Sequence, residues 1–168
     1  QEKELVLKTV IEETNGRVPV YAGTGCISTK DTIRMSKMAE SLGADVLSII
    51  TPSFAAASQN ELYEHFKAVA EAVPNMPIVL YNIPARTGNA IAPDTVGRLA
   101  EIDNIVGAKD SSGNFNNILE YIAKTDKNFS VLSGNDALII WNLLAGGTGG
   151  IAGCANLYPK TMSSIYDL

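Results

Sequence analysis

Residues 104–133 read NIVGAKDSSGNFNNILEYIAKTDKNFSVLS and contain one complete strand–helix–strand pattern. An apolar run closed by a cluster of small polar residues predicts a buried strand over 104–109. A helical pattern follows over 114–123, and a second short apolar run predicts another strand over 129–133. Two strands joined by a helical crossover run parallel in one sheet. This stretch therefore predicts a parallel α/β fold.

The same pattern repeats along the chain. Further strands are predicted over 18–22, 45–50, 77–82 and 150–154, so the first residues of successive strands lie 21 to 32 positions apart. Further helices are predicted over 2–13, 29–42 and 59–73, from Pro93 onward, and over 136–145 and 159–168. Near-continuously apolar strands are typical of a sheet that is buried on both faces. A doubly wound sheet and a (β/α)8 barrel both fit, and the regular repeat without a second domain favours the barrel.

A complete barrel of this kind has eight strand–helix units and about 250 residues. The 168 residues of this chain hold six such units. We therefore expect residues 1–168 to form a single α/β domain that is an incomplete (β/α)8 TIM barrel. Such a fragment lacks the first two βα units and the C-terminal helices. Its first and last predicted strands are then edges that do not pair with each other.

The composition argues against several classes of protein. The formal net charge of −5 and the scattered basic residues argue against a nucleic-acid-binding surface. No apolar run reaches the roughly 18 residues that a membrane-spanning helix needs. One histidine and two distant cysteines, Cys26 and Cys154, argue against a zinc site. Both thiols are predicted to be buried and reduced, which favours a cytoplasmic location.

Polar residues gather where the predicted strands end, and ligands bind at this end of the strands in parallel α/β folds. Lys109 ends the strand 104–109, and Tyr81 lies near the end of the preceding strand. Lysine is rarely buried without a partner, so Lys109 is either a charge at the point where the strand reaches solvent or the reactive group of a site. Tyr81 is likewise either a core residue or a site residue.

These residue types can perform one kind of chemistry together. Loss of hydration lowers the pKa of a lysine, and the neutral amine can form a Schiff base with a carbonyl compound. A tyrosine beside the lysine can relay protons during that reaction. Arg86, in the loop after Tyr81, is either an ordinary loop charge or a planar partner for a substrate carboxylate. Gly134, just after the fifth predicted strand, is a further candidate for substrate binding.

Other conspicuous residues are assigned structural roles. The run Gly147-Thr148-Gly149 follows a helix and precedes a strand, which is the wrong order for a dinucleotide-binding loop and favours a tight turn. Trp141 lies at helical spacing and is predicted to pack in the core, and His65 is predicted to be a surface or packing residue.

Two segments, YNIPARTG at 81–88 and GAKDSSGN at 107–114, resemble those of the dihydrodipicolinate synthase / N-acetylneuraminate lyase family of class I aldolases. The segments YAGTG, VLSGNDA and GGIAGCAN fall in the family's order, so the resemblance covers the whole chain. It implies a (β/α)8 barrel that binds pyruvate as a Schiff base on Lys109, with Tyr81 as the proton relay and no cofactor. It also implies that Arg86 holds the carboxylate of an aldehyde substrate and that the backbone carbonyl of Ile151 faces the site.

The resemblance is strongest to the dihydrodipicolinate synthase branch. It implies a homo-oligomer, a tetramer or dimer, that condenses pyruvate with aspartate semialdehyde in lysine biosynthesis. One alternative is a pyruvate-releasing aldolase or dehydratase of a sugar acid, of the N-acetylneuraminate lyase or 2-keto-3-deoxygluconate aldolase type. Another is a barrel that binds 2-oxo acids without catalysis.

The sequence departs from the family's pattern at two places. The Thr-Thr pair that grips the pyruvate carboxylate in the family has no counterpart in this chain. The loop Thr51-Pro52-Ser53-Phe54 stands where the synthase branch usually reads Thr-Pro-Tyr-Tyr. It therefore lacks the second tyrosine, which in that branch is donated towards the site of a neighbouring subunit.

Overall fold

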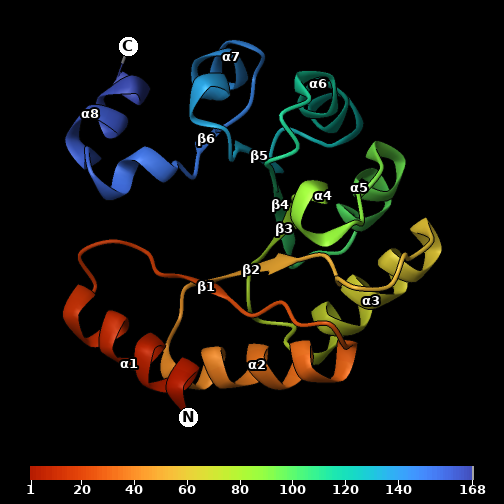
Figure 1. Ribbon diagram of the computed structural model, residues 1–168, viewed down its shortest axis with the longest axis vertical. Coiled ribbons are helices and arrows are strands. Elements are labelled where there is room, and N and C mark those ends of the chain that lie inside the picture. The colour runs from red at the N-terminus through yellow and green to blue at the C-terminus, as the bar shows by residue number, and fades with distance from the viewer. Residues whose placement is uncertain (168) are drawn as a thin grey trace.

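The computed structural model describes residues 1–167 and places six strands in one curved sheet (Figure 1). Each strand pairs in parallel with the next one along the chain. The strands are β1 Tyr21–Gly23, β2 Val46–Ile50, β3 Ile78–Asn82, β4 Ile105–Asp110, β5 Ser130–Ser133 and β6 Gly149–Gly150. No pairing joins β1 to β6 within the described residues. The sequential strand order and the open edges confirm a partial barrel and exclude a doubly wound sheet.

Helices surround the convex outer side of the sheet, and α1 and α8 flank its open side (Figure 1). The α-helices are α1 Glu2–Thr14, α2 Thr29–Leu42, α3 Gln59–Ala72, α4 Pro84–Thr87, α5 Pro93–Leu99, α6 Phe115–Lys124, α7 Ile139–Leu144 and α8 Pro159–Ser164. Short 3₁₀ helices are η1 Asp136–Leu138, η2 Gly153–Asn156 and η3 Ile165–Asp167. The predicted helix 159–168 includes Leu168, which lies outside the described residues.

Local sequence sets the ends of the helices. α2 has the predicted bounds, because the Ser28 side chain accepts a hydrogen bond from the Asp31 backbone at its start. Gly43 ends α2 in a left-handed conformation, with φ of 89°, that glycine adopts without strain. Ser58 and Glu61 form a capping box at the start of α3, which fixes where that helix begins.

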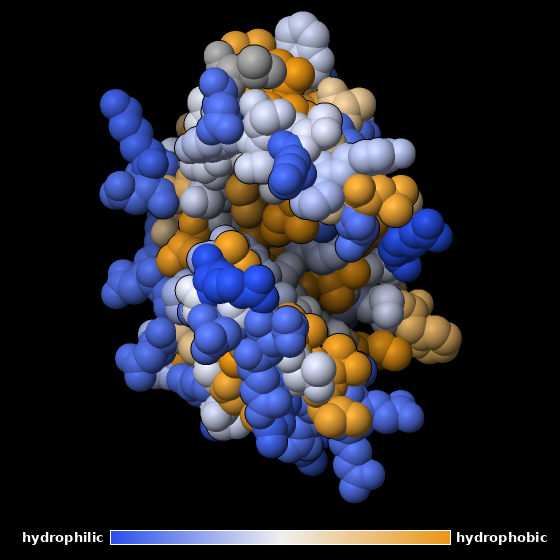
Figure 2. Space-filling view, turned by 90° about the vertical axis from the view of Figure 1, so that its left-hand side faces the viewer, coloured by the Kyte–Doolittle hydropathy of each residue, from blue (hydrophilic) through white to orange (hydrophobic). Residues whose placement is uncertain are grey.

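The hydrophobic core lies between the sheet and the helices. In β2, Leu47 and Ile49 are fully buried in a cluster that includes Phe66 of α3, whereas Ser48 and Ile50 are only half-buried. Within residues 1–167, β2 is therefore buried on one face and half-buried on the other, which differs from the prediction. Helices cover the convex face, and the concave face is partly closed as well, since Val79 of β3, on the same face as Tyr81, is 1% exposed. The open side of the molecule is shown in Figure 2, where apolar residues lie in a hollow between polar surfaces.

The two edge strands differ from the prediction. β6 contains only Gly149–Gly150, and η2 follows where the strand was expected to continue to residue 154. The reason is a side-chain acceptor: Asp136 accepts hydrogen bonds from the backbone N–H groups of Gly153 and Cys154, each at 2.9 Å, which holds these residues in a turn. β1 begins at Tyr21 instead of residue 18, and just before it the Val20 N–H donates to the Asp45 side chain at 2.7 Å instead of to a strand backbone.

Two predicted core residues lie at the surface. Trp141 is 58% exposed, because α7 turns Ile139 and Asn142 towards the interior instead. Cys154 is exposed and Cys26 only partly buried, so the prediction of two buried thiols is wrong. His65 is buried in the packed face of α3, as a packing residue should be. Gly147 and Thr148 lie in the short connection between α7 and β6, as predicted, and Gly149 is the first residue of β6.

Candidate active site

Lys109 and Tyr81 lie side by side at the carboxyl end of the sheet. They are register partners on β4 and β3, and both side chains are half-buried on the concave face. Lys109 Nζ lies over the Tyr81 ring, 4.1 Å from its centroid. An ammonium at this distance from an aromatic face is attracted by the ring quadrupole. The two side chains that the sequence singled out are therefore in direct contact.

Gly134 lies against the end of the Lys109 side chain. A Cβ built at position 134 would lie 2.7 Å from Lys109 Cε and would collide with the Ser111 hydroxyl. The Gly134 backbone is held there because its N–H donates to the carbonyl of Asp110 at 2.7 Å. A side chain at this position would displace Lys109 or Ser111, so Gly134 forms one wall of the space around the lysine.

Arg86 lies in α4, the short helix that follows β3. This helix was predicted as a loop, and Pro84 at its first turn favours its formation. Arg86 is exposed, and no carboxylate within residues 1–167 forms an ion pair with it. Its guanidinium is therefore open to solvent at the same end of the sheet as Lys109.

Ile151 directly follows β6 at the open edge. Its N–H donates to the Ser133 carbonyl at 2.9 Å, which keeps Ile151 beside the end of β5. Asp136 then holds the segment that follows. Hydrogen bonds from Cys154, through its side chain and its backbone, hold the pKa of Asp136 below its ordinary value, and the nearby charge of Lys109 adds to this effect. The Asp136 carboxylate is thus a second charge near Lys109.

A buried polar pair, Asn82 and Asp110, lies directly behind Lys109 and Tyr81, and the site prediction missed it. Asp110 was predicted to follow the strand, but it is the last residue of β4 and is buried. Its carboxylate accepts a hydrogen bond from Asn82 Nδ2 at 2.7 Å. The signal was available in the sequence, because strand alternation turns residue 110 to the opposite face from Lys109.

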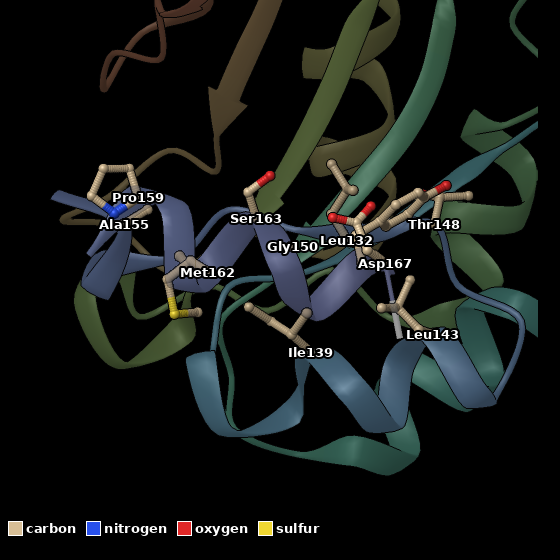
Figure 3. A pocket seen from close by; sticks show the side chains of 13 residues that line it. Leu132, Ile139, Leu143, Thr148, Gly150, Ala155, Pro159, Met162, Ser163 and Asp167 are labelled. Carbon is tan, nitrogen blue, oxygen red and sulfur yellow. The ribbon is translucent and has the colours of Figure 1, made fainter. Parts of the chain in front are cut away.

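An apolar hollow near the open edge is separate from these residues. It encloses about 440 Å³ among β5, β6, α7 and α8, and Ile139, Leu143 and Met162 are among the side chains that line it (Figure 3). None of the five candidate residues lines it. Its lining includes Leu132, the register partner of Lys109 on β5, so the hollow begins one strand away from the lysine.

Other kinds of site find no support in the part of the chain that the structure describes. No group of three or more His, Cys, Asp and Glu side chains is arranged to hold a metal ion. No described helix is both long enough and apolar enough to cross a bilayer.

Comparisons with known proteins agree with this architecture. A model of the "Dihydrodipicolinate synthetase family" matches residues 1–168. The chain is 42% identical over 168 residues to 4-hydroxy-tetrahydrodipicolinate synthase of Clostridium novyi, covering 100% of this chain and 56% of that protein. The chain thus spans little more than half the length of this curated relative.

Solved structures give the same match. The 4-hydroxy-tetrahydrodipicolinate synthase of Methylacidiphilum fumariolicum superposes with a TM-score of 0.96 at 37% identity, over 99% of this chain and 56% of that one. The dihydrodipicolinate synthase of Acinetobacter baumannii, solved in complex with pyruvate, gives a TM-score of 0.94 at 42% identity, over 97% of this chain and 56% of that one.

Proposed function

Because the chain belongs to the dihydrodipicolinate synthetase family, we propose that the whole protein is a Schiff-base lyase that acts on pyruvate. Its most specific form is a 4-hydroxy-tetrahydrodipicolinate synthase, which condenses pyruvate with aspartate semialdehyde in lysine biosynthesis. The observation that carries the proposal is the contact between Lys109 and Tyr81 at the carboxyl end of the sheet. The pyruvate complex of the similar Acinetobacter enzyme supports the choice of first substrate.

The chemistry starts at the Lys109 amine. Only the neutral amine is a nucleophile, so the ammonium group must give up a proton before it can attack. The neutral amine then adds to C2 of pyruvate and gives a carbinolamine, which loses water to form an imine. Loss of a C3 proton gives an enamine, whose C3 forms the new bond to the aldehyde carbon while the aldehyde oxygen takes up a proton. Water then cleaves the resulting imine, which releases the product and restores the Lys109 amine. We assign to the Tyr81 hydroxyl the transfer of protons during these steps.

Arg86 supports an aldehyde that carries a carboxylate. A guanidinium binds a carboxylate through two parallel hydrogen bonds, and Arg86 is exposed without an acidic partner among residues 1–167. We assign Ile151 and Gly134 to the wall of the pyruvate site. The loop after β2 favours the alternative, a sugar-acid aldolase, because Phe54 is 96% exposed and offers no hydroxyl there.

The test of the proposal uses the full-length protein, pyruvate and borohydride. Reduction should add the mass of a reduced pyruvate to Lys109. Lys109→Arg should abolish this adduct, whereas Lys127→Arg, an exposed lysine beyond the other end of the sheet, should leave it unchanged. Reversible pyruvate binding without an adduct would point to a binding protein instead. Turnover with aspartate semialdehyde or with sugar acids then decides the second substrate.

We also propose that the whole protein is a homo-oligomer. Within residues 1–167, α7 exposes Ile140, Trp141 and Leu144, and in the full-length protein this face packs either against the rest of the same chain or against another copy. Sedimentation of the full-length protein should show a dimer or tetramer. Trp141→Glu should shift the distribution to smaller species if this helix lies in an interface between copies.

A further inference from the structure

A second pair of side chains joins β3 to β4 directly behind Tyr81 and Lys109. Asn82 and Asp110 are register partners, one position beyond the Tyr81–Lys109 pair. Successive side chains of a strand point to opposite faces, so Asn82 and Asp110 lie on the helix-covered face of the sheet. Asn82 Nδ2 donates to Asp110 Oδ2 at 2.7 Å, and Asp110 is only 2% exposed. The Tyr81–Lys109 pair and the Asn82–Asp110 pair therefore lie on opposite faces of the same two strands.

The Asp110 carboxylate is held by neutral donors alone. Its Oδ1 accepts from the Ser112 backbone at 2.9 Å and from the Ser112 hydroxyl at 2.6 Å. No ion pair within residues 1–167 includes Asp110. A buried carboxylate without a cation depends on such hydrogen bonds, because each one that is lost leaves charge unsolvated. The carboxylate therefore fixes both Asn82 and the turn that begins at Ser111.

Asn82 is fixed from its other side. Its Oδ1 accepts from the Ile91 N–H at 3.0 Å, and the Ile91 carbonyl accepts from the Tyr121 hydroxyl at 2.7 Å. A carboxylate only accepts and a backbone N–H only donates, so the Asn82 amide has one orientation that satisfies both. Burial first, and the charge of Asp110 second, raise the pKa of Tyr121 and keep it a donor. One chain of hydrogen bonds thus links α6 to the end of β4.

We infer that Asn82 and Asp110 are positioning residues that hold Lys109 against Tyr81. The inference rests on the proposed function, because it concerns the same lysine. Two hydrogen bonds hold β3 against β4 next to Tyr81 and Lys109. One joins Asn82 to Asp110, and in the other the Ser111 N–H donates to the Asn82 carbonyl at 2.8 Å. A displacement of about 1 Å between reacting groups can slow a reaction by roughly 100-fold.

The test exchanges the two side chains. Asn82→Asp alone sets two carboxylates face to face. Asp110→Asn alone places two amide groups opposite each other. If the new amide keeps its oxygen towards Ser112, its NH2 group faces that of Asn82. If the Asn82 amide then turned to present its oxygen, its own NH2 group would face the Ile91 N–H. In the double variant, the amide at position 110 donates to the carboxylate at position 82 and accepts from Ser112. The carboxylate at position 82 also accepts from Ile91, so every hydrogen bond can form again.

The readouts are the rate of borohydride-trapped imine formation with pyruvate, kcat, KM and the melting temperature of the full-length variants. Each single variant should form the imine on the order of 10- to 100-fold more slowly at temperatures where circular dichroism shows it folded. The double exchange should recover most of the rate. Asn104→Ala is the control for stability alone, since Asn104 donates to carbonyls of Ala70, Val73 and Met76 beyond the opposite end of β4. It should lower the melting temperature and leave the imine rate unchanged.

Three results would overturn the inference. Folded single variants could form the imine at the rate of the unmodified protein, the double exchange could restore stability without restoring the rate, or Asn104→Ala could slow the reaction as much as the exchanges do. An unmodified protein that forms no imine is a different result. It removes the proposed function itself, and the inference with it.

Discussion

Thr51 donates a hydrogen bond to the Thr87 hydroxyl at 2.8 Å, and both residues are buried. Thr51 directly follows β2, and Thr87 is the last residue of α4, the helix that carries Arg86. Thr87 also donates to the Asn89 carbonyl at 3.0 Å, and Asn89 Nδ2 donates to the Ala55 carbonyl at 2.8 Å. The loop after β2 and the helix of Arg86 are therefore held together as one unit.

We expect Thr87→Val to be more destabilising than Thr51→Val. Thr87 both donates to Asn89 O and accepts from Asn89 N, so its loss leaves buried groups unpaired and should lower the free energy of unfolding by about 1–3 kcal/mol. Thr51→Val removes one donor and should lower it by about 1 kcal/mol. Urea unfolding measures both values. A larger loss of stability for Thr51→Val than for Thr87→Val would contradict this account of the loop.

The same Thr87→Val variant should affect the aldehyde substrate more than pyruvate. Arg86 is the neighbour of Thr87, and its backbone loosens when α4 loses its hydrogen bonds. Under the proposed function, KM for aspartate semialdehyde should rise while the rate of imine formation on Lys109 stays unchanged. A slower imine step with an unchanged KM would show that the loop supports Lys109 instead.

Gly134→Ala should block the lysine without unfolding the protein. The added methyl would lie against Lys109 Cε and the Ser111 hydroxyl, so one of the two side chains must move. We expect imine formation to fall on the order of 100-fold. An imine rate equal to that of the unmodified protein would remove Gly134 from the site.

His65 should make the fold less stable in acid. It is 6% exposed, its Nδ1 lies 2.9 Å from Thr29 Oγ1, and burial lowers its pKa to about 4 from an ordinary 6.5. The unfolded chain therefore binds the proton first. Stability is fully present above pH 6.5 and is lost as the pH falls towards 4, by up to about 3 kcal/mol. In urea unfolding, His65→Gln should lose much less stability than the unmodified protein between pH 7 and pH 4.5. An equal loss of stability in the variant and in the unmodified protein would exclude His65 as the source of the acid sensitivity.

Much of the fold and site could be predicted because it depends on local pattern. The strand over 104–109 and the tyrosine one strand before it follow from apolar runs and their polar ends, and the register places Tyr81 opposite Lys109. The half-buried concave positions of β2 were missed, because apolar composition does not say how many layers cover a sheet. β6 was too long in the prediction because its course depends on Asp136, 17 residues before Gly153.

The Asn82–Asp110 pair was missed for a different reason. Its members are 28 positions apart, and only the sheet register makes them neighbours. Once Tyr81 and Lys109 are placed opposite each other, the next residue of each strand must form the next pair, on the other face. A carboxylate in that place needs donors, and Asn82 supplies one. The pair is therefore predictable from the register, but not from either segment alone.

Asp136 should also control how fast Cys154 reacts. The Cys154 thiol donates to the Asp136 carboxylate, and this hydrogen bond and the negative charge raise the pKa of Cys154. Since the thiolate is the nucleophile, the exposed thiol should be alkylated slowly at pH 8. Asp136→Asn removes the charge and should speed alkylation of Cys154, while Cys26 in the same molecule keeps its rate.

Mass spectrometry of peptides after a timed iodoacetamide pulse measures the two thiols separately. Asp126→Asn is the matched control, because Asp126 caps the turn before β5 through Asn128 N at 2.7 Å and has no bond to Cys154. It should leave both alkylation rates unchanged. If Asp136→Asn slows Cys154 or leaves its rate as it was, the carboxylate does not suppress the thiolate. The slow reaction would then have to come from limited access of the reagent to the turn after β6.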